Sequence, residues 1–268
     1  MLAVVEDNLQ SAEIILTQLN DDSIKAYLLF LKYSLNFFNH FNALFQSRKI
    51  LIYKLFINSQ QLIRQIGQNF MIPEALKDIT TFNDDEHNIQ QLTNIYVGPE
   101  CEGFLASRSF EFAQQIRLNC LNFYKIALNE MLKRLPYKDV LFEQLNFLEA
   151  KVALYNKGRL IIKDLSYIAT RVENIDVTKL AFKWRVLPTV FSDSEKINLA
   201  SLKIDKMWAK ILDFQDFNGE KMFPNLELLR GNTTVTVSKN RFFFSIFVMF
   251  GVLKICPYNI MVKFVTEL

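Results

Sequence analysis

The sequence predicts an all-α protein: a multi-helix bundle of long amphipathic helices, followed by an irregular apolar C-terminal tail. Three observations support this fold class. The 268 residues include only 7 glycines and 6 prolines, too few for a fold dense in turns. Half of the residues are hydrophobic, so a sizeable core can be buried. Along the long segments, apolar residues recur with a period near 3.6.

The first half of the chain predicts three helices. One covers residues 8–19, and residues 20–23 interrupt it and offer an N-cap for the next. The second runs from Ile24 to Phe45, with a wide apolar stripe that suits packing on several neighbours. The third covers residues 48–70 and ends before Pro73.

The middle of the chain predicts a long polar loop and then more helices. Residues 78–103 are polar and weakly periodic, and we expect a loop with short pieces of structure there. Apolar residues from Phe112 to Met131 mark a long helix that Pro136 ends. Asp139 is expected to cap a short helix after it.

Two further helices are expected over residues 160–172 and 177–187. Ser192 and Glu195 have the spacing of a capping box, in which each side chain bonds the other residue's backbone N–H. We expect the helix that this box opens to continue to Leu212. The helical region therefore covers residues 1–229.

Composition changes after Leu229, and residues 230–268 form an unmatched apolar tail. Residues 233–238 alternate as a strand would, and residues 242–253 carry no charge. We expect the tail to be foreign to the helical fold, the alternative being a strand or helix buried in the core. Membrane attachment through residues 242–264 is disfavoured, because that length is reached only by including charged and polar residues and a proline.

Eight large apolar side chains are predicted to be largely buried because they lie on the inner stripes of these helices. They are Leu31, Leu35, Phe38, Leu55, Ile116, Phe123, Trp184 and Trp208. If Leu35 is fully packed, its replacement by alanine should cost about 2–5 kcal/mol.

Charge and cysteine content limit the partners and the compartment. The net charge of +3 is too small for a dedicated polyanion binder, so we expect at most weak, salt-sensitive DNA binding. Cys101, Cys120 and Cys256 fit no zinc-ligand spacing and are interpreted as free thiols in a reducing compartment. The N-terminus lacks the pattern of a signal peptide, and an intracellular protein is expected.

The sequence offers little chemistry. No phosphate-binding loop, dinucleotide fingerprint or nucleophile motif is present, so we predict no cofactor, no small-molecule substrate and no catalytic or metal-binding residue. His40 is expected to be a buried or half-buried structural residue, and His87 to lie in a solvated loop. The candidate nucleic-acid contacts are Lys183, Trp184 and Arg185, where an aromatic ring lies between two cations.

Eight strings of residues, taken in order, carry a family resemblance. They are LLFLKY at 28–33, FNHFNALFQS at 38–47, NIYVG at 94–98, RLNCLNFY at 117–124, KRLPYKD at 133–139, LNFL at 145–148, WRVLP at 184–188 and NGEKMFPNL at 218–226. In this order and spacing they resemble the transposase-like proteins of the hAT superfamily, over roughly residues 1–229.

The resemblance implies a function in transposition. Transposases of this family have a ribonuclease-H-like core interrupted by a helical insertion, and Asp, Asp and Glu hold the metal ions that cleave DNA. The matched strings correspond to the helical insertion and its flank. No residue here matches the three acidic ligands, so the resemblance implies a chain that is not an enzyme. It also implies a nuclear location and DNA or other hAT-like proteins as partners.

Three hypotheses about function follow. The first is a transposon-derived, non-catalytic fragment of a hAT-type transposase with residual DNA or protein binding. The second is a helical interaction module recruited by the host, which could self-associate. The third is a membrane-attached protein that uses residues 242–264.

Overall fold

A computed structural model of the protein describes residues 21–46, 52–78, 85–155, 164–170 and 172–230. They form helices and irregular segments without any strand, which confirms the predicted all-α class. Two isolated β-bridges, Met71–Ile89 and Gln215–Lys221, are the extended pairings within these ranges.

The chain divides into two compact units. Among the described residues, unit 1 comprises residues 21–44, 60–78 and 85–135, and unit 2 comprises residues 45–46, 52–59, 136–155, 164–170 and 172–230. The helical region predicted over residues 1–229 therefore falls, in its described part, into two units.

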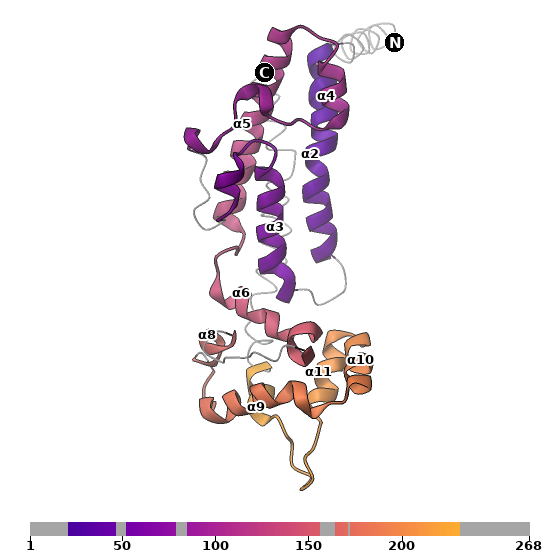
Figure 1. The fold of residues 1–268 in the computed structure, drawn as a ribbon, viewed down its shortest axis with the longest axis vertical. Coiled ribbons are helices and arrows are strands. Elements are labelled where there is room, and N and C mark those ends of the chain that lie inside the picture. Colours follow the sequence, from indigo (N-terminus) through magenta and orange to yellow (C-terminus); the bar gives the residue numbers. More distant parts are fainter. Residues whose placement is uncertain (1–20, 47–51, 79–84, 156–163, 171, 231–268) are drawn as a thin grey trace, which may run out of the picture. The chain divides into compact units, whose positions relative to one another are not determined.

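Long helices form unit 1. The helices α2 (Asp22–Gln46) and α5 (Phe110–Arg134) have 25 residues each, and α3 (Leu55–Gly67) enters the unit from residue 60. These three helices run alongside one another, and the short α4 (Pro99–Leu105) lies beside α2 (Figure 1). The two helices predicted from Ile24 and from Phe112 are therefore confirmed.

Side-chain caps fix where the long helices begin. The Asp21 carboxylate accepts a hydrogen bond from the Ser23 N–H at 2.7 Å, at the start of α2. The Ser109 hydroxyl accepts one from the Phe112 N–H at 3.2 Å, at the start of α5. Each cap satisfies one of the backbone donors that a helix start leaves unpaired.

Aromatic rings fill the core of unit 1. Phe30 of α2 meets the edges of Phe123 and Tyr124 of α5, with centroids 5.3 and 5.2 Å apart. Phe70, which follows α3, stacks on Tyr124 at 5.6 Å with the rings nearly parallel. Offset and edge-to-face contacts of this kind add to the free energy gained from burying the rings.

The predicted polar loop at 78–103 contains the expected short pieces, but it also contributes to the core. It holds the 3₁₀ turns η4 (Glu86–Asn88) and η5 (Leu92–Asn94) and the helix α4. Ile95 and Val97 are fully buried. Isolated apolar residues within a polar stretch produce no periodic signal, which is why the sequence pattern missed them.

Backbone hydrogen bonds attach this segment to the chain that follows α3. The N–H of Ile72 donates to the carbonyl of Asn88, and the N–H of Gln90 donates to the carbonyl of Phe70. The N–H of Tyr96 donates to the carbonyl of Asn69 at 2.8 Å. Residues 85–103 are therefore attached to unit 1 by these bonds.

Unit 2 is built from shorter elements. In chain order they are η1 (Ile52–Lys54), α6 (Val140–Gln144), the 3₁₀ turn η6 (Leu145–Leu148), the π-turn η7 (Lys151–Tyr155), α8 (Ser166–Ala169), α9 (Val177–Val190), α10 (Asp193–Ser201) and α11 (Ile204–Leu212). Residues 224–230 are also helical. The fold class holds here, but the expected long helices do not.

Several predicted helix starts in unit 2 are confirmed. Asp139 accepts from the Leu141 N–H at 2.8 Å and caps α6. The Ser192 hydroxyl accepts from the Glu195 N–H, and the Glu195 carboxylate accepts from the Ser192 N–H, which is the predicted capping box. The helix predicted at 177–187 is present as α9 and continues to Val190.

The single helix predicted from Ser192 to Leu212 is wrong. Leu202 has an extended backbone with ψ of 161°, which ends α10, and α11 begins afresh after Lys203. The helix predicted at 160–172 is present only as the four-residue α8 among the described residues. Apolar spacing predicts which face is inward, but it does not detect a break of two residues that keeps the same face inward.

The core of unit 2 surrounds both tryptophans. Phe147 of η6 meets Trp184 of α9 at 6.1 Å and Trp208 of α11 at 5.7 Å, edge to face in both cases. The Trp208 indole N–H donates to the carbonyl of Leu148 at 2.8 Å. A buried indole thus satisfies its own donor and a backbone acceptor.

Seven of the eight side chains predicted to be buried are buried, and Leu35 is the exception. It is half-buried, while Ser34 and Phe38 beside it face the interior. The inner stripe of α2 passes through Ser34, and one residue along a helix turns the side chain by about 100°. The small serine hid the true centre of the stripe from the hydrophobic pattern.

Two predicted features lie outside the described residues: the helix at 8–19 and the tail at 230–268, of which only Arg230 is described. Within the ranges that are described, no helix combines the length and apolar character needed to cross a membrane.

Candidate functional site

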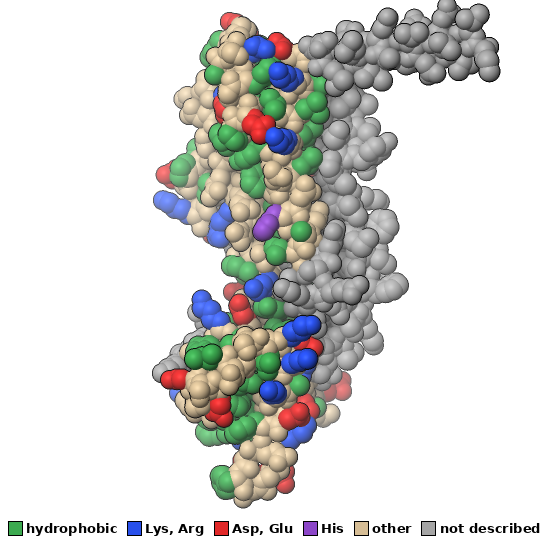
Figure 2. All heavy atoms as spheres, turned by 90° about the vertical axis from the view of Figure 1, so that its right-hand side faces the viewer, with side chains coloured by type: hydrophobic (Ala, Val, Ile, Leu, Met, Phe, Trp, Pro, Cys, Tyr) green, Lys and Arg blue, Asp and Glu red, His purple; other side chains and the backbone are tan. Residues whose placement is uncertain are grey.

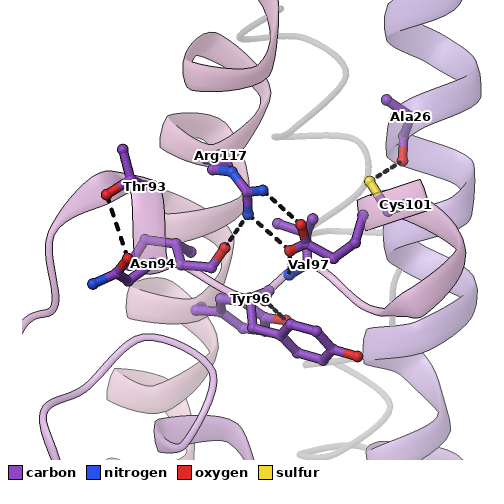
Figure 3. A network of polar contacts seen from close by, with 10 residues as sticks. Ala26, Thr93, Asn94, Tyr96, Val97, Cys101 and Arg117 are labelled. Carbon is purple, nitrogen blue, oxygen red and sulfur yellow. Dashed lines mark hydrogen bonds and ion pairs between the residues drawn. The ribbon is translucent and has the colours of Figure 1, made fainter. Parts of the chain in front are cut away.

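The densest polar network of unit 1 joins α5 to the segment before α4. The Arg117 guanidinium pairs with both carboxylate oxygens of Glu102, at 2.8 and 2.5 Å, and also donates to the carbonyl of Ile95. The same carboxylate accepts from the Val97 N–H at 3.1 Å. Figure 3 shows Arg117 pointing from its helix toward the backbone around Val97.

This arrangement satisfies its own groups. The guanidinium and the carboxylate are mostly buried, with 15% and 28% of the side chains exposed. The hydrogen bonds that Arg117 donates to the Glu102 carboxylate raise the pKa of Arg117, so the guanidinium stays charged. A bidentate pair that also bonds the backbone is well suited to fixing a loop, and it leaves little donor or acceptor capacity for a ligand.

Tyrosines complete the attachment of this segment. The Tyr124 hydroxyl donates to the carbonyl of Tyr96 at 3.0 Å, and the Tyr33 hydroxyl donates to the side-chain oxygen of Asn69 at 2.8 Å. Gly98 has a φ of +94°, and a Cβ there would lie 2.5 Å from the Tyr33 ring. Burial raises the pKa of Tyr33 to about 12, so both tyrosines act as neutral hydrogen-bonding groups.

The two described cysteines are free and buried, as the sequence predicts for their redox state. The Cys101 thiol donates to the carbonyl of Ala26 at 3.4 Å. Burial raises the pKa of Cys101 to about 11 and that of Cys120 well above its usual range. Because the thiolate is the reactive form, neither thiol has the properties of a nucleophile. Cys256 lies outside the described residues.

The two histidines are both exposed. His87 lies in η4, consistent with the predicted solvated segment. The expectation that His40 is buried or half-buried is wrong, because it lies on the outer face of α2. Among the described residues, no three His, Cys, Asp or Glu side chains gather in a way that could hold a metal ion.

The predicted nucleic-acid contact is not presented as one surface. Trp184 is fully buried, and its indole N–H donates to the Asp164 carboxylate at 3.2 Å. Trp184 therefore offers no face on which a base could stack, and its inclusion in the contact is corrected. Lys183 is partly exposed and Arg185 is exposed, so these two remain predicted contacts without the aromatic ring between them.

A more ordered basic surface lies on α11. Lys203, Lys206 and Lys210 are all exposed: Lys206 and Lys210 lie on one face of the helix, and Lys203 is its N-cap residue, three positions before Lys206. Met207, Trp208 and their neighbours on the opposite side are buried in the unit 2 core. Helical spacing could have found this stripe, but a search for adjacent basic residues overlooked it.

An exposed aromatic residue lies just beyond that helix. Phe217 is 97% exposed at the tip of the turn between the bridged residues Gln215 and Lys221. The Asp216 carboxylate accepts from the backbone N–H groups of Asn218 and Glu220, which holds the turn in shape.

No family model, curated protein or solved structure matches this chain. The resemblance to hAT transposases therefore stays a prediction of the sequence.

Proposed function

We propose that this protein is a transposon-derived, non-catalytic fragment of a hAT-type DNA transposase, and that its function is binding to DNA or protein. The proposal includes a nuclear location. The observation that supports it is where the resembling strings fall in the fold. Four of the eight strings contact one another within the two units, so in these places the resemblance lies in residues that determine structure.

In unit 1, the strings at 94–98 and 117–124 meet directly. Arg117 bonds the carbonyl of Ile95, and Tyr124 bonds that of Tyr96. In unit 2, Phe147 of the string at 145–148 packs on Trp184 of the string at 184–188. Segments far apart in the chain thus resemble the family at both sides of the same contacts, as a retained helical scaffold would.

A binding role agrees with the properties of the polar groups. The buried network of Arg117 and Glu102 is saturated by its own members, and the described thiols have raised pKa values. Among the described residues, Lys183 and Arg185 on α9 and Lys206 and Lys210 on α11 are cations that no described ion pair includes. A surface of that kind recognises a partner by charge.

The test is incubation of the purified chain with transposon-end DNA and Mg²⁺ or Mn²⁺. We expect no strand cleavage or transfer. A matched sample purified in the same way from cells without the expressed protein controls for contaminating nucleases. Cleavage that follows the protein through purification would overturn the proposal.

The second candidate is a host-recruited helical interaction module, and Phe217 is the observation that favours it. Phe217 is nearly fully exposed on a hydrogen-bonded turn, and aromatic residues are enriched in protein interfaces. If the module self-associates through this turn, the Phe217→Ser variant should have a lower mass by sedimentation than the wild-type oligomer. Phe182→Ser, at a 62% exposed site on α9, is the matched control. A wild-type monomer across the micromolar range would count against self-association.

A further inference from the structure

We propose that the stripe of Lys203, Lys206 and Lys210 on α11 binds consecutive phosphates of a nucleic-acid duplex. This inference rests on the binding role proposed above and names the surface that carries it. Figure 2 shows Lys and Arg side chains gathered on the side of unit 2 where α10 and α11 lie. The evidence comes from the charge, the spacing and the position of the three lysines.

The three lysines take no part in the ion pairs found within the described residues. Those ion pairs involve other lysines and arginines. The nearest carboxylates along the helix are Asp205 and Asp213. Asp205 is turned about 100° away from the stripe, and Asp213 stands at its C-terminal end.

A fourth cation adds to this surface. The Arg230 guanidinium donates to the backbone carbonyl of Asp205 at 3.5 Å, which places it beside the first turn of α11. Arg230 therefore lies near Lys203 and Lys206 at the start of α11.

Two of the three lysines lie where a positive charge disfavours the helix. Lys203 occupies the N-cap of α11 without a side-chain capping bond, and Lys206 lies in its first turn. The N-terminal end of a helix carries partial positive charge, so cations there are unfavourable, and Ser, Thr, Asp or Asn are the preferred caps. These lysines do not serve the stability of the helix, which points to a role outside the fold.

The length of the lysine stripe matches the spacing of phosphates along a duplex. At 1.5 Å per residue, Lys203 and Lys210 are about 10 Å apart along the helix axis. Phosphates of one duplex strand follow each other every ~3.4 Å along the duplex axis, so the stripe can lie beside about three of them. The buried face of α11, held by the Trp208 hydrogen bond to Leu148, keeps the three lysines on a fixed support.

The experiment compares the full chain with a triple variant, Lys203→Gln, Lys206→Gln and Lys210→Gln. The control is Lys77→Gln, Lys125→Gln and Lys151→Gln, which removes the same charge at scattered sites. Binding to a labelled 20-base-pair DNA duplex is measured by fluorescence anisotropy between 50 and 200 mM salt. An RNA duplex of the same sequence and polyglutamate are used as competitors.

For wild-type protein, three phosphate contacts should weaken binding about 40-fold over this salt range. The stripe variant should lose most of this binding and lower the logarithmic salt slope by about 2 to 3, whereas the control should lower it by less than about 1. The stripe variant should melt near the wild-type temperature, because it removes two charges that oppose the helix dipole and one, Lys210, that favours it. The relative strength of the two duplexes as competitors identifies DNA or RNA as the source of the phosphates.

Three results would overturn the inference. They are no duplex binding by the wild type at 50 mM salt, equal loss in the stripe and control variants, and loss on Arg185→Ala instead. Competition by polyglutamate at equal charge as strong as that by duplex would assign the surface to an acidic protein. None of these results involves cleavage, so failure of this inference is distinguishable from failure of the proposed function.

Discussion

The two units bury their cores by different means. Unit 1 packs two 25-residue helices and then holds a non-helical segment against them with directional bonds from Arg117, Tyr124 and Tyr33. Unit 2 has short helices whose shared contact is a cluster of apolar rings around Trp184 and Trp208. The two units of one chain therefore hold their cores differently. Specific polar contacts attach the irregular segment of unit 1, and aromatic packing joins the short helices of unit 2.

The largest effect should come from the core of unit 2. Trp208→Ala removes a fully packed ring and leaves the carbonyl of Leu148 without its donor, and it should cost about 4 kcal/mol. Trp208→Phe keeps most of the apolar surface and should cost about 2 kcal/mol, mainly the lost hydrogen bond. Urea unfolding followed by circular dichroism measures both. Equal costs for the two variants would contradict the importance of apolar packing in this unit.

The comparable position in unit 1 is a backbone position. Gly98→Ala should cost about 3 kcal/mol, because φ of +94° is strained for alanine and the new Cβ would overlap the Tyr33 ring. Gly103→Ala is the matched control, since a Cβ there meets nothing within 4 Å and alanine favours the helix α4. The control should be neutral or stabilising by up to about 1 kcal/mol. Thermal melting of both variants measures the two effects. An unchanged melting temperature for Gly98→Ala would show that glycine at this position is not needed for the stability of unit 1.

A third change sharpens the polar half of the comparison. Arg117→Met keeps the length of the side chain but leaves Glu102 and the carbonyl of Ile95 without their main donor, and it should cost about 2 kcal/mol. Arg108→Met breaks the more exposed pair with Asp22 and should cost less than Arg117→Met. Chemical denaturation gives both values. If the two agree within error, burial of the Arg117 pair has no energetic consequence.

A fourth change concerns the long-helix packing. Leu35 is half-buried, so Leu35→Ala should cost about 1 kcal/mol, below the range for a fully packed leucine. Leu31→Ala, one turn earlier and buried, should cost about 3 kcal/mol. The unfolding midpoints of the two variants in urea should therefore differ clearly. Coinciding midpoints would contradict the position of the inner stripe of α2, in which Leu31 is buried and Leu35 is half-buried.

The smallest effect should be a pH dependence. Hydrogen bonds from Arg134 and then Lys133 lower the pKa of Glu130 in the folded state below its usual 4.5. A lowered folded pKa means that the stabilisation is present above pH 4.5 and is lost as pH falls below it. Glu130→Gln should therefore lose less stability than the wild type when the pH is lowered from 5 to 3. Melting temperatures across that range test it, and parallel curves would contradict it.

The sequence predicts the helices better than the segments between them. Helix starts with a side-chain cap, such as those at Asp139 and Ser192, follow from local chemistry and are confirmed. The break at Leu202 and the core residues Ile95 and Val97 depend on contacts with distant parts of the chain, which no local pattern records. The fold class could therefore be predicted from the sequence, and the division into two units could not.

The candidate site follows the same rule. Trp184 was expected both to be buried and to contribute to a binding surface, and its burial excludes the second role. His40 was placed among phenylalanines in the sequence, yet it lies on the exposed side of α2. The α11 stripe was visible in principle as lysines three and four residues apart, because the periodicity that locates a core also locates its opposite face.

The placement of the tryptophans has an optical consequence. The chain has two, and both lie in unit 2. Indole emission therefore reports on unit 2 alone, while circular dichroism records the helices of both units. Superimposable curves from the two signals would mean that the units unfold as one cooperative system, and separated curves would give the stability of each. The protein thus carries, without any label, the means to ask whether its two ways of building a core are energetically coupled.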